Sequence, residues 1–455
     1  MAKRQRVVVI GGGFAGFTAV RALSGIAKGA IEIVLINPTD YFLYLPLLPE
    51  VAAGILDPRK VAIPLSGNYP GVRHLLACVD TVDIEARRLK CTDAEGNPRE
   101  LGYDRLVVAV GSVNKLLPIP GVAEHAHGFR SIAEALYLRD HLIRQIELAA
   151  TSDDPEERRA RCTFVVVGAG YTGTEVAAQG QLLTLDTRRR QTALRDQPVR
   201  WILADVAPRI LPGLDERLSR TAHRTLSERG MEIRTGTNVA EATADGVKFS
   251  DGEFVPTRSL IWCVGVRPDP MVESLGLPTA KGRLLVDEYL RVPGHPEIYA
   301  CGDAAAVPDL TRPGEYTPMT AQHAGRQGRR AAHNIAASYG HGRLLPYRHH
   351  DLGFVVDLGG AAAAANPLGV PLSGVVAKAV TRGYHLLAIP HGRARIAGSW
   401  LLDLVLPRQI VQLGTVDGSE VPLACTTPEH PHSPSAPRPE PVKPVKLKGR
   451  RDPSA

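Results

Sequence analysis

The stretch that decides the fold is "VVVGAGYTGTEVA", residues 165–177. A run of β-branched residues ends in a glycine turn and passes directly into a helical segment, which is the arrangement that binds a dinucleotide. The chain spells the same pattern earlier, as "VVVIGGGFAGFTAV" at residues 7–20. Each copy is followed by a further strand, "IEIVLIN" at 31–37 and "RWILAD" at 200–205. Two copies in the same context predict an α/β protein with two Rossmann-like dinucleotide-binding domains.

The glycines of each turn have separate tasks. The first allows the tight turn, the second lets the backbone approach a pyrophosphate, and the third lets the helix pack against the strand. The pyrophosphate is expected at the helix N-terminus, where unpaired N–H groups point toward it. The predicted cofactor contacts from the two turns are Gly11, Gly13, Phe14, Ala15 and Gly16, and Gly168, Gly170, Tyr171, Thr172 and Gly173.

The strand that follows each turn is expected to end in an acceptor for the ribose hydroxyls. Asp205 closes "RWILAD", where its carboxylate accepts from a 2′-OH and repels a 2′-phosphate, which favours NADH over NADPH. The competing interpretation is an ordinary surface aspartate. The first unit has Asn37 at the equivalent place, and its amide can still hydrogen-bond a hydroxyl.

The segment "ACGDAA" separates the roles of the two turns. We expect the strand that ends in Gly302 and Asp303 to open a helix, with the carboxylate on a flavin's ribityl chain. Because this segment comes after both units, it predicts that the chain returns to complete the first domain around FAD and leaves the second for NADH. The predicted cofactor contacts also include Ala109 and Gly111 of "VVAVGS" and Gly265 of "WCVGVRP", and no metal site is expected.

The length of 455 residues suggests two or three domains. We predict an FAD-binding domain from residues 1–118 and 288–346, an NADH-binding domain from 119–287, and a C-terminal amphipathic helical region from 347–417. Residues 418–455 are rich in Pro, Ser and charge and are predicted to be a disordered tail.

Composition and charge exclude several classes. No apolar run reaches the ~18 residues that a transmembrane helix needs, and the N-terminus shows no export signal. The six cysteines show no CxxC spacing, which fits a reducing cytoplasm. The net charge of +7 is partly in the basic C-terminus, and the absence of interleaved aromatic and basic residues argues against a nucleic-acid partner.

Two amphipathic segments lie between residues 372 and 406. We expect each to be a helix with one polar and one apolar face. The segments are either a foot on the membrane surface or helices that pack on the flavin domain. In the first segment the expected polar face has Lys378 and Arg382, and the apolar face has Val375, Val376, Ala379 and Val380. In the second segment the expected polar face has Arg395, Ser399 and Asp403, and the apolar face has Ile396, Trp400, Leu401, Leu404 and Val405. In the foot, Trp400 would lie at the interface, with Arg393, Arg395 and Arg408 toward phosphates, whereas Lys378 would touch the acceptor, a headgroup or solvent.

From about Arg6 to Gly414 the chain resembles the type II NADH dehydrogenases, single-chain NADH:quinone oxidoreductases among the flavoproteins with two dinucleotide domains. The more specific similarities are "FLYLPLLPEVAAG", "TAQHAGRQG" and the amphipathic C-terminus. The resemblance implies an FAD-dependent enzyme that does not pump protons and passes hydride from NADH to flavin and electrons to a quinone. It also implies a peripheral position on the inner face of the cell membrane. A homodimer is left open.

The resemblance also assigns roles near the acceptor. Glu175 matches a glutamate near the nicotinamide and quinone, and Ala321 and Gln322 match the element against the isoalloxazine and quinone. Glu175 and Gln322 are therefore the expected catalytic residues. The competing interpretation of Glu175 is a first-turn glutamate favoured by the helix dipole, and His323 is a weaker candidate for proton chemistry. The chain departs from the family at Asn37, Gln179 and Arg326, where the family often has an acid, a glutamate and a glutamine.

Rival functions stay open to different degrees. A disulfide reductase needs a cysteine pair beside the flavin, and "FLYLPLLPEVAAG" has none. A sulfide:quinone reductase also needs a cysteine in the C-terminal third, and the sequence has none between Cys301 and Cys425. The remaining alternatives are an NADH-dependent reductase of a small redox protein or another non-quinone acceptor, and a flavoprotein sensor that binds NADH.

Overall fold

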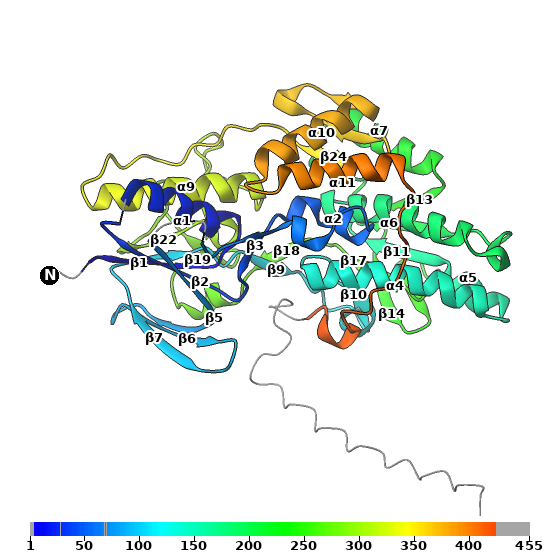
Figure 1. Ribbon diagram of the computed structural model, residues 1–455, viewed down its shortest axis with the longest axis horizontal. Coiled ribbons are helices and arrows are strands. Elements are labelled where there is room, and N and C mark those ends of the chain that lie inside the picture. The colour runs from blue at the N-terminus through cyan, green and yellow to red at the C-terminus, as the bar shows by residue number, and fades with distance from the viewer. Residues whose placement is uncertain (1–3, 28, 68, 70, 425–455) are drawn as a thin grey trace, which may run out of the picture.

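The structure is a computed structural model that describes residues 4–27, 29–67, 69 and 71–424. Two sheets, one mixed and one parallel, lie side by side in the view of Figure 1, each with helices against it. The first sheet is parallel at its centre and continues at β5 into an antiparallel meander. Its strands in spatial order are β21 (Arg291–Val292), β22 (His295–Ala300), β8 (Arg105–Val108), β1 (Arg6–Ile10), β2 (Glu32–Asn37), β5 (Val72–Asp83), β6 (Arg88–Asp93) and β7 (Pro98–Gly102).

The second sheet repeats the same order of strand, glycine turn, helix and strand. It is parallel throughout and consists of β10 (Ala126–His127), β17 (Leu260–Trp262), β11 (Thr163–Val167), β12 (Arg200–Asp205) and β13 (Met231–Thr235). A small antiparallel sheet beside it contains β14 (Val239–Thr243), β15 (Gly246–Phe249) and β16 (Phe254–Pro256). The predicted α/β fold with two Rossmann-like domains is confirmed.

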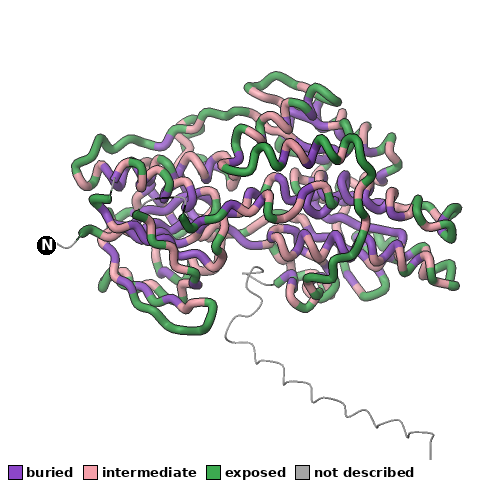
Figure 2. The backbone as a smooth tube through the Cα atoms, in the orientation of Figure 1, coloured by how far each residue is buried: buried purple, intermediate pink, exposed green. Residues whose placement is uncertain are grey.

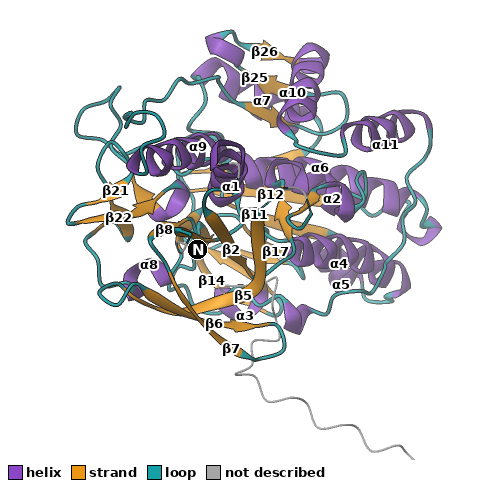
Figure 3. Ribbon diagram, turned by 60° about the vertical axis from the view of Figure 1, so that its left-hand side comes forward, coloured by secondary structure: helices purple, strands orange, loops and turns teal. Residues whose placement is uncertain are grey.

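Helices cover the sheets, as the purple ribbons of Figure 3 show. In the first domain α1 (Phe14–Ala27) packs along α9 (Ala321–Ser338), and the small α2 (Leu48–Ala52) bridges to the second domain. There it meets α4 (Ile132–Thr151) and α6 (Tyr171–Arg189). The remaining helices of the two domains are α3 (Val122–His125), α5 (Pro155–Arg161), α7 (Glu216–Glu228) and α8 (Met271–Ser274).

The chain crosses between the domains on two antiparallel strands, β9 (Ser112–Asn114) and β18 (Val266–Pro268). After β18 the chain forms a small sheet in which β20 (Arg283–Leu285) pairs with β19 (Thr279–Ala280) and with β23 (Ala305–Ala306). These pairings join the chain on both sides of residue 287, and the expected boundary there stays a prediction. A two-residue edge strand gives too weak a sequence pattern to place it.

The C-terminal region consists of a small sheet and two helices, and it lies above the second domain in Figure 1. The sheet contains β24 (Val355–Asp357), β25 (Ala363–Ala365) and β26 (Leu372–Ser373), and the helices are α10 (Gly374–Ala388) and α11 (Arg393–Val405). Both amphipathic segments are thus helical, but the expected polar face of the first one is not exposed. Lys378 is buried, whereas Val375 and Val376 face outward.

On the second helix, α11, the predicted apolar face is divided: Ile396 and Trp400 are buried, whereas its leucines and Val405 face outward. Ser399 is also buried against the body, while Leu401, Leu404 and Val405 are exposed. Figure 2 shows exposed stretches in the C-terminal region. The expected place of Trp400 at a membrane interface is therefore wrong. The buried polar side chains have partners: Lys60 donates to the Ser399 hydroxyl, and Arg408 pairs with Asp403 at 2.6 Å. Sequence alone could not show these partners.

The predicted tail divides at residue 424. Residues 418–424 are placed against the second domain: Gly418–Glu420 forms a turn of 3-10 helix, and Val421 and Leu423 are buried. The expected start of the tail at 418 is therefore too early, because these two apolar residues find a core to pack in. Residues 425–455 lie outside the described part of the chain. Among the described residues, no helix combines the length and apolar character needed to cross a bilayer.

Candidate active site

The two glycine turns have almost superimposable local geometry. Gly11 and Gly168 adopt φ values of 98° and 101°, a region that favours glycine. A Cβ at Gly16 would lie 1.8 Å from the Gly11 carbonyl oxygen, and a Cβ at Gly173 would lie 1.8 Å from that of Gly168. The third glycine in each motif is therefore required for the helix to pack against the turn.

The middle glycine of each turn faces open space. A Cβ at Gly13 or at Gly170 would meet no heavy atom within 4 Å, and both residues line one continuous cavity. In contrast to the third glycines, these positions leave the backbone free for close approach by a ligand. This is the cradle that a dinucleotide pyrophosphate needs.

The polar residue that ends the second strand holds each turn. The Asn37 amide oxygen accepts from the Gly12 N–H at 2.6 Å, and the Asp205 carboxylate accepts from the Ala169 N–H at 2.5 Å. The second carboxylate oxygen of Asp205 accepts from the Ala207 N–H at 2.8 Å. Both side chains line the cavity, so a role toward a ribose stays a prediction for each.

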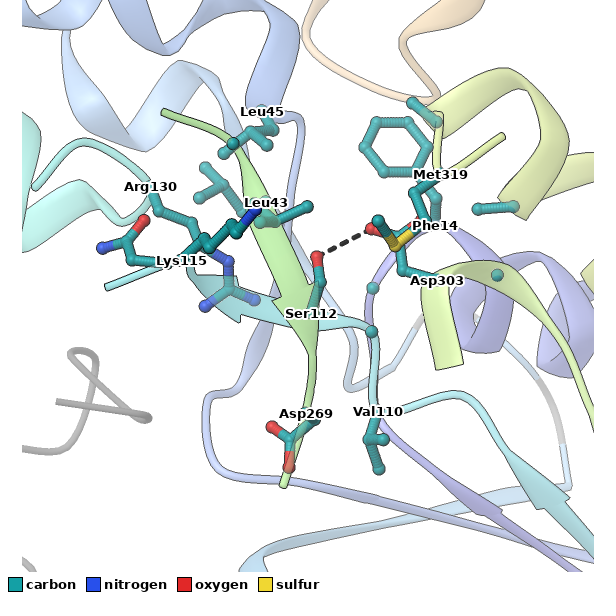
Figure 4. A pocket seen from close by; sticks show the side chains of 18 of the residues that line it. Phe14, Leu43, Leu45, Val110, Ser112, Lys115, Arg130, Asp269, Asp303 and Met319 are labelled. Atoms are coloured by element: carbon teal, nitrogen blue, oxygen red, sulfur yellow. Dashed lines mark hydrogen bonds between the residues drawn. The ribbon is translucent and has the colours of Figure 1, made fainter. Parts of the chain in front are cut away.

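One cavity of about 820 Å³ runs from the first glycine turn to the second. Figure 4 shows its centre, where Asp303, Phe14 and Met319 lie on one side and Lys115 and Arg130 on the other. Its volume lies within the range of sites for large organic ligands. The predicted contacts that line it are Gly11, Gly13, Phe14, Ala15, Asn37, Ala109, Gly111, Gly168, Gly170, Tyr171, Thr172, Asp205, Gly265, Gly302, Asp303 and Ala321. Gly16 and Gly173 support the turns from behind, and neither Glu175 nor Gln322 is part of the lining.

Asp303 is placed by two residues that the sequence did not single out. Ser112 donates to the Asp303 carboxylate at 2.7 Å, and the Gln327 amide oxygen accepts from the Gly302 N–H at 2.8 Å (Figure 4 shows the first bond). Burial raises the pKa of Asp303, and the Ser112 bond opposes that rise. These contacts fit a carboxylate held toward a polar group in the cavity.

The helix expected directly after Asp303 is absent. Gly302–Ala304 is a single turn of 3-10 helix, followed by β23, and the next helix along the chain, α9, is the one after Asp303 whose start faces the cavity. Thr320 caps α9 by accepting from the His323 N–H at 3.3 Å, and Thr320 and Ala321 line the cavity. The positive helix end is therefore supplied by a segment nearly twenty residues further along the chain than expected.

Glu175 is half-buried and belongs to a group of charged side chains next to the cavity. It projects from α6 one helical turn after Tyr171, and its carboxylate accepts from the Asp357 N–H at 2.8 Å. The Asp357 carboxylate in turn pairs with the Lys378 ammonium. Burial raises the pKa of Glu175 to about 8. The expectation that Lys378 touches a headgroup or solvent is therefore wrong.

Glu50 adds a second acid to this group. It is buried on α2, within the stretch "FLYLPLLPEVAAG", and it accepts from the Trp400 indole N–H at 2.5 Å. Burial is the main cause that raises the pKa of Glu50, and the neighbouring Asp357 raises it further. We name Glu50, Glu175, Asp357 and Lys378 the acidic cluster. It joins both domains to the C-terminal region, a convergence that the sequence pattern did not indicate.

Gln322 and His323 point toward the segment that follows α9. The Gln322 amide donates to the Gly353 carbonyl at 3.2 Å, and the His323 imidazole bonds the Tyr347 hydroxyl at 2.9 Å. Burial lowers the pKa of His323 to about 4, so this ring is neutral near pH 7. The same segment continues to Phe354, which stacks on Tyr171 with ring centroids 5.2 Å apart. Gln322 thus positions the loop that leads into β24, the strand that carries Asp357, and its catalytic role stays a prediction.

Comparisons of the sequence with known proteins identify the family of the chain. Residues 5–328 match the family model of pyridine nucleotide-disulphide oxidoreductases. The type II NADH:quinone oxidoreductase Ndh of Mycobacterium tuberculosis is 31% identical over 427 residues, which cover 90% of this chain and 89% of the relative. This chain belongs to the type II NADH:quinone oxidoreductases.

Two further comparisons fit that family. The demethylphylloquinone reductase NdbB of a Synechocystis strain is 32% identical and covers 85% of this chain and 93% of its own length. The structure of NDH2 from Plasmodium falciparum in complex with NADH has a TM-score of 0.81 and 18% identity, and it covers 90% of this chain and 100% of its own. That likeness shows the fold.

These relatives confirm the predicted family, and with it the predicted enzyme class, function and cofactors, FAD and NADH. The soluble reductase and the sensor are not favoured. The geometry fits the two cofactors, because each glycine turn offers an open backbone cradle and Asp303 faces the cavity beside the first.

Proposed function

We propose that this chain oxidises NADH at the second glycine turn, holds FAD at the first, and reduces a quinone beside the acidic cluster at a membrane surface. The observation that carries the proposal is that one cavity connects both turns, with the acidic cluster next to it and exposed apolar helices above. A flavin supplies hydride and electron transfer between a nicotinamide and an acceptor. The protein's part is to align the two ligands and to handle protons.

Alignment depends on contacts between the domains. The β9–β18 pair fixes the crossing, and the Phe354–Tyr171 stack ties the C-terminal region to the second turn. Ser112, at the start of β9, also holds Asp303 on the first domain. These contacts link the two halves of the cavity, so that ligands in both halves would stay in register.

Proton supply is the proposed task of the acidic cluster. Quinone reduction takes up two protons, and Glu175 keeps its proton at neutral pH because burial raises its pKa to about 8. Lys378 neutralises Asp357, which otherwise would be a buried unpaired charge. Glu175 can therefore donate a proton while its neighbours stay fixed.

The acceptor proposal is tested by comparing acceptors with purified, FAD-loaded protein. We expect continuous NADH oxidation with a short-chain quinone. Turnover with a ferredoxin-type redox protein but none with quinone would identify the protein as a reductase of a small redox protein. Bleaching of the flavin by NADH without turnover on any acceptor would identify a sensor.

Asp205→Asn is expected to weaken the preference for NADH over NADPH. Its carboxylate lines the cavity at the end of β12, where a negative charge repels a 2′-phosphate. Loss of the charge should lower the NADH/NADPH ratio of kcat/KM about tenfold, or about 1.4 kcal/mol. Steady-state kinetics with both nucleotides measure the ratio. Asp196→Asn, an exposed substitution in the same domain, is the control, and equal ratios in the two variants would contradict the ribose assignment.

The outward apolar face of α10 and α11 supports the proposed membrane contact. Leu387 and Leu404 are each 77% exposed, and exposed Arg393 and Arg395 lie at the start of α11. Contiguous exposed apolar side chains mark an interaction surface, and nearby arginines favour anionic headgroups. We therefore propose that this face lies on the inner surface of the cell membrane.

Leu387→Asp with Leu404→Asp is expected to release the protein from anionic phospholipid vesicles. Two leucines that no longer enter the interface cost about 3 kcal/mol or more, which is about a hundredfold in partition. Co-sedimentation with vesicles measures the effect. The matched control is Leu148→Asp with Phe254→Asp, two exposed apolar positions outside the C-terminal region. Equal loss in both double variants, or retention in the first, would contradict the proposed face.

A further inference from the structure

Beyond α11 the chain forms an extended strap, residues 407–424, that runs back across the second domain. Figure 1 shows it as the orange to red segment that descends beside α4 toward β10. Its backbone is bonded at several points. Arg190 donates to the Arg408 carbonyl at 2.7 Å, and Arg139 donates to the Val411 carbonyl at 2.8 Å. The strap is therefore fixed near its start by side chains of the second domain.

Buried polar groups of α4 are committed to the strap. The Asp140 carboxylate accepts from the N–H groups of Leu413 and Gly414 at 2.9 and 2.7 Å, and both Asp140 and Arg139 are buried. A buried carboxylate that accepts two backbone N–H groups is an anchor of high cost to break. Further along, Gly418 lies so close to Tyr137 that a Cβ there would be 3.0 Å from the phenol oxygen.

The strap ends against the wall of the nucleotide cavity. Leu423 is 2% exposed and belongs to the same apolar cluster as Trp262, which lines the cavity. A Cβ on Gly128 would meet a Leu423 methyl group at 3.2 Å and the Glu134 carboxylate at 2.2 Å. Gly128 directly precedes Phe129 and Arg130, which are both part of the cavity wall.

Glu134 holds the other side of this wall. Its carboxylate accepts from the Arg130 N–H at 2.7 Å and from the Asn114 amide at 3.1 Å, and Asn114 and Arg130 both line the cavity. Leu423 covers Gly128 beside this carboxylate. The wall segment 128–130 is therefore held between a polar anchor from α4 and an apolar anchor from the strap.

We propose that the strap is a positioning element for the NADH site, with Leu423 holding residues 128–130 in the place that binds the nicotinamide nucleotide. Leu423 touches none of the reacting atoms and acts through the wall that it covers. The proposal concerns binding at the second turn and does not depend on which acceptor takes the electrons. Its effect should therefore appear in nucleotide affinity and leave the flavin and the acceptor half of the reaction unchanged.

The test is Leu423→Ala in the full chain loaded with FAD. Because small displacements of a binding wall cost much affinity, we expect the Kd for NAD⁺, followed by quenching of tryptophan fluorescence, to rise about threefold to tenfold. Flavin content and the rate of flavin bleaching at saturating NADH should equal those of the wild type. Leu413→Ala is the matched control, because Leu413 lies on the same strap and is 50% exposed.

Two further variants keep the outcome decisive. Leu423→Met preserves volume and apolar character, so it should restore the wild-type Kd. If Leu423→Ala does not fold with its flavin, Leu423→Val removes less volume and should still raise the Kd. An unchanged Kd in Leu423→Ala, or in Leu423→Val where that variant replaces it, would overturn the proposal. A loss confined to the bleaching rate, with normal Kd, would do the same.

Discussion

Gly173→Ala is expected to abolish NADH oxidation while the protein keeps its flavin, whereas Gly16→Ala is expected to yield protein without flavin. In each case the added Cβ would lie 1.8 Å from the carbonyl oxygen of the first glycine, so the helix must move away from its turn. A shift of this kind at a pyrophosphate cradle should reduce binding about a hundredfold or more. The bound-flavin absorbance of purified protein and NADH titrations measure the two effects separately.

Gly25→Ala is the control for these two variants. Gly25 lies within α1, and a Cβ there would meet no atom within 4 Å, so alanine should be neutral or slightly stabilising. Comparison of Gly16→Ala with Gly173→Ala distinguishes the two turns, because the two turns have the same geometry and differ only in the ligand that each is proposed to bind. Loss of flavin from Gly173→Ala together with normal flavin in Gly16→Ala would reverse the assignment of FAD to the first turn and NADH to the second.

Glu175→Gln is expected to slow quinone reduction about a hundredfold to ten-thousandfold, the range for loss of a general acid. The substitution should preserve the fold, because Glu175 is already protonated at neutral pH and a glutamine oxygen can still accept from the Asp357 N–H. The wild-type rate of flavin reoxidation by a short-chain quinone should fall as pH rises through about 8, since Glu175 loses its proton there. The variant, which has no proton to lose, should lack this alkaline decline.

Asp186→Asn on the same helix is the matched control. Asp186 is half-buried and pairs with Arg189 at 2.9 Å, away from the acidic cluster, so both the rate and its pH dependence should stay unchanged. Reduction of the flavin by NADH should be normal in both variants. An alkaline decline that persists in Glu175→Gln would assign that titration to another group, and a wild-type rate in that variant would remove Glu175 from the proton path.

The parts of the site that sequence could predict are local in the chain. Gly16 and Gly173 are informative because the close contact that each permits is made with a residue only five positions away. Asp205 and Asn37 were predictable because a strand of ordinary length brings its last residue beside the preceding turn. Rules of backbone geometry therefore fixed both dinucleotide units, along with most of the residues that line the cavity.

The parts that sequence could not predict depend on distant partners. Lys378 was expected to touch the acceptor, a lipid headgroup or solvent, and the sequence did not show that its ammonium pairs with Asp357 inside the molecule. On α10 Lys378 turns inward while Val375 and Val376 face outward, and on α11 Ile396 and Trp400 are buried while Leu404 and Val405 are exposed. Amphipathic periodicity identifies two faces of a helix but does not tell which face is buried, and here a buried ion pair reverses the usual choice.

The most direct test of the account is a double-mixing stopped-flow measurement on the FAD-loaded protein. In the first mix NADH should bleach the visible absorbance of the flavin, because the two glycine turns share one cavity. In the second mix a short-chain quinone should restore that absorbance in one rapid phase. Bleaching that ferricyanide reverses and quinone does not would contradict the quinone site, and an absence of bleaching would contradict the assignment of NADH to the second turn.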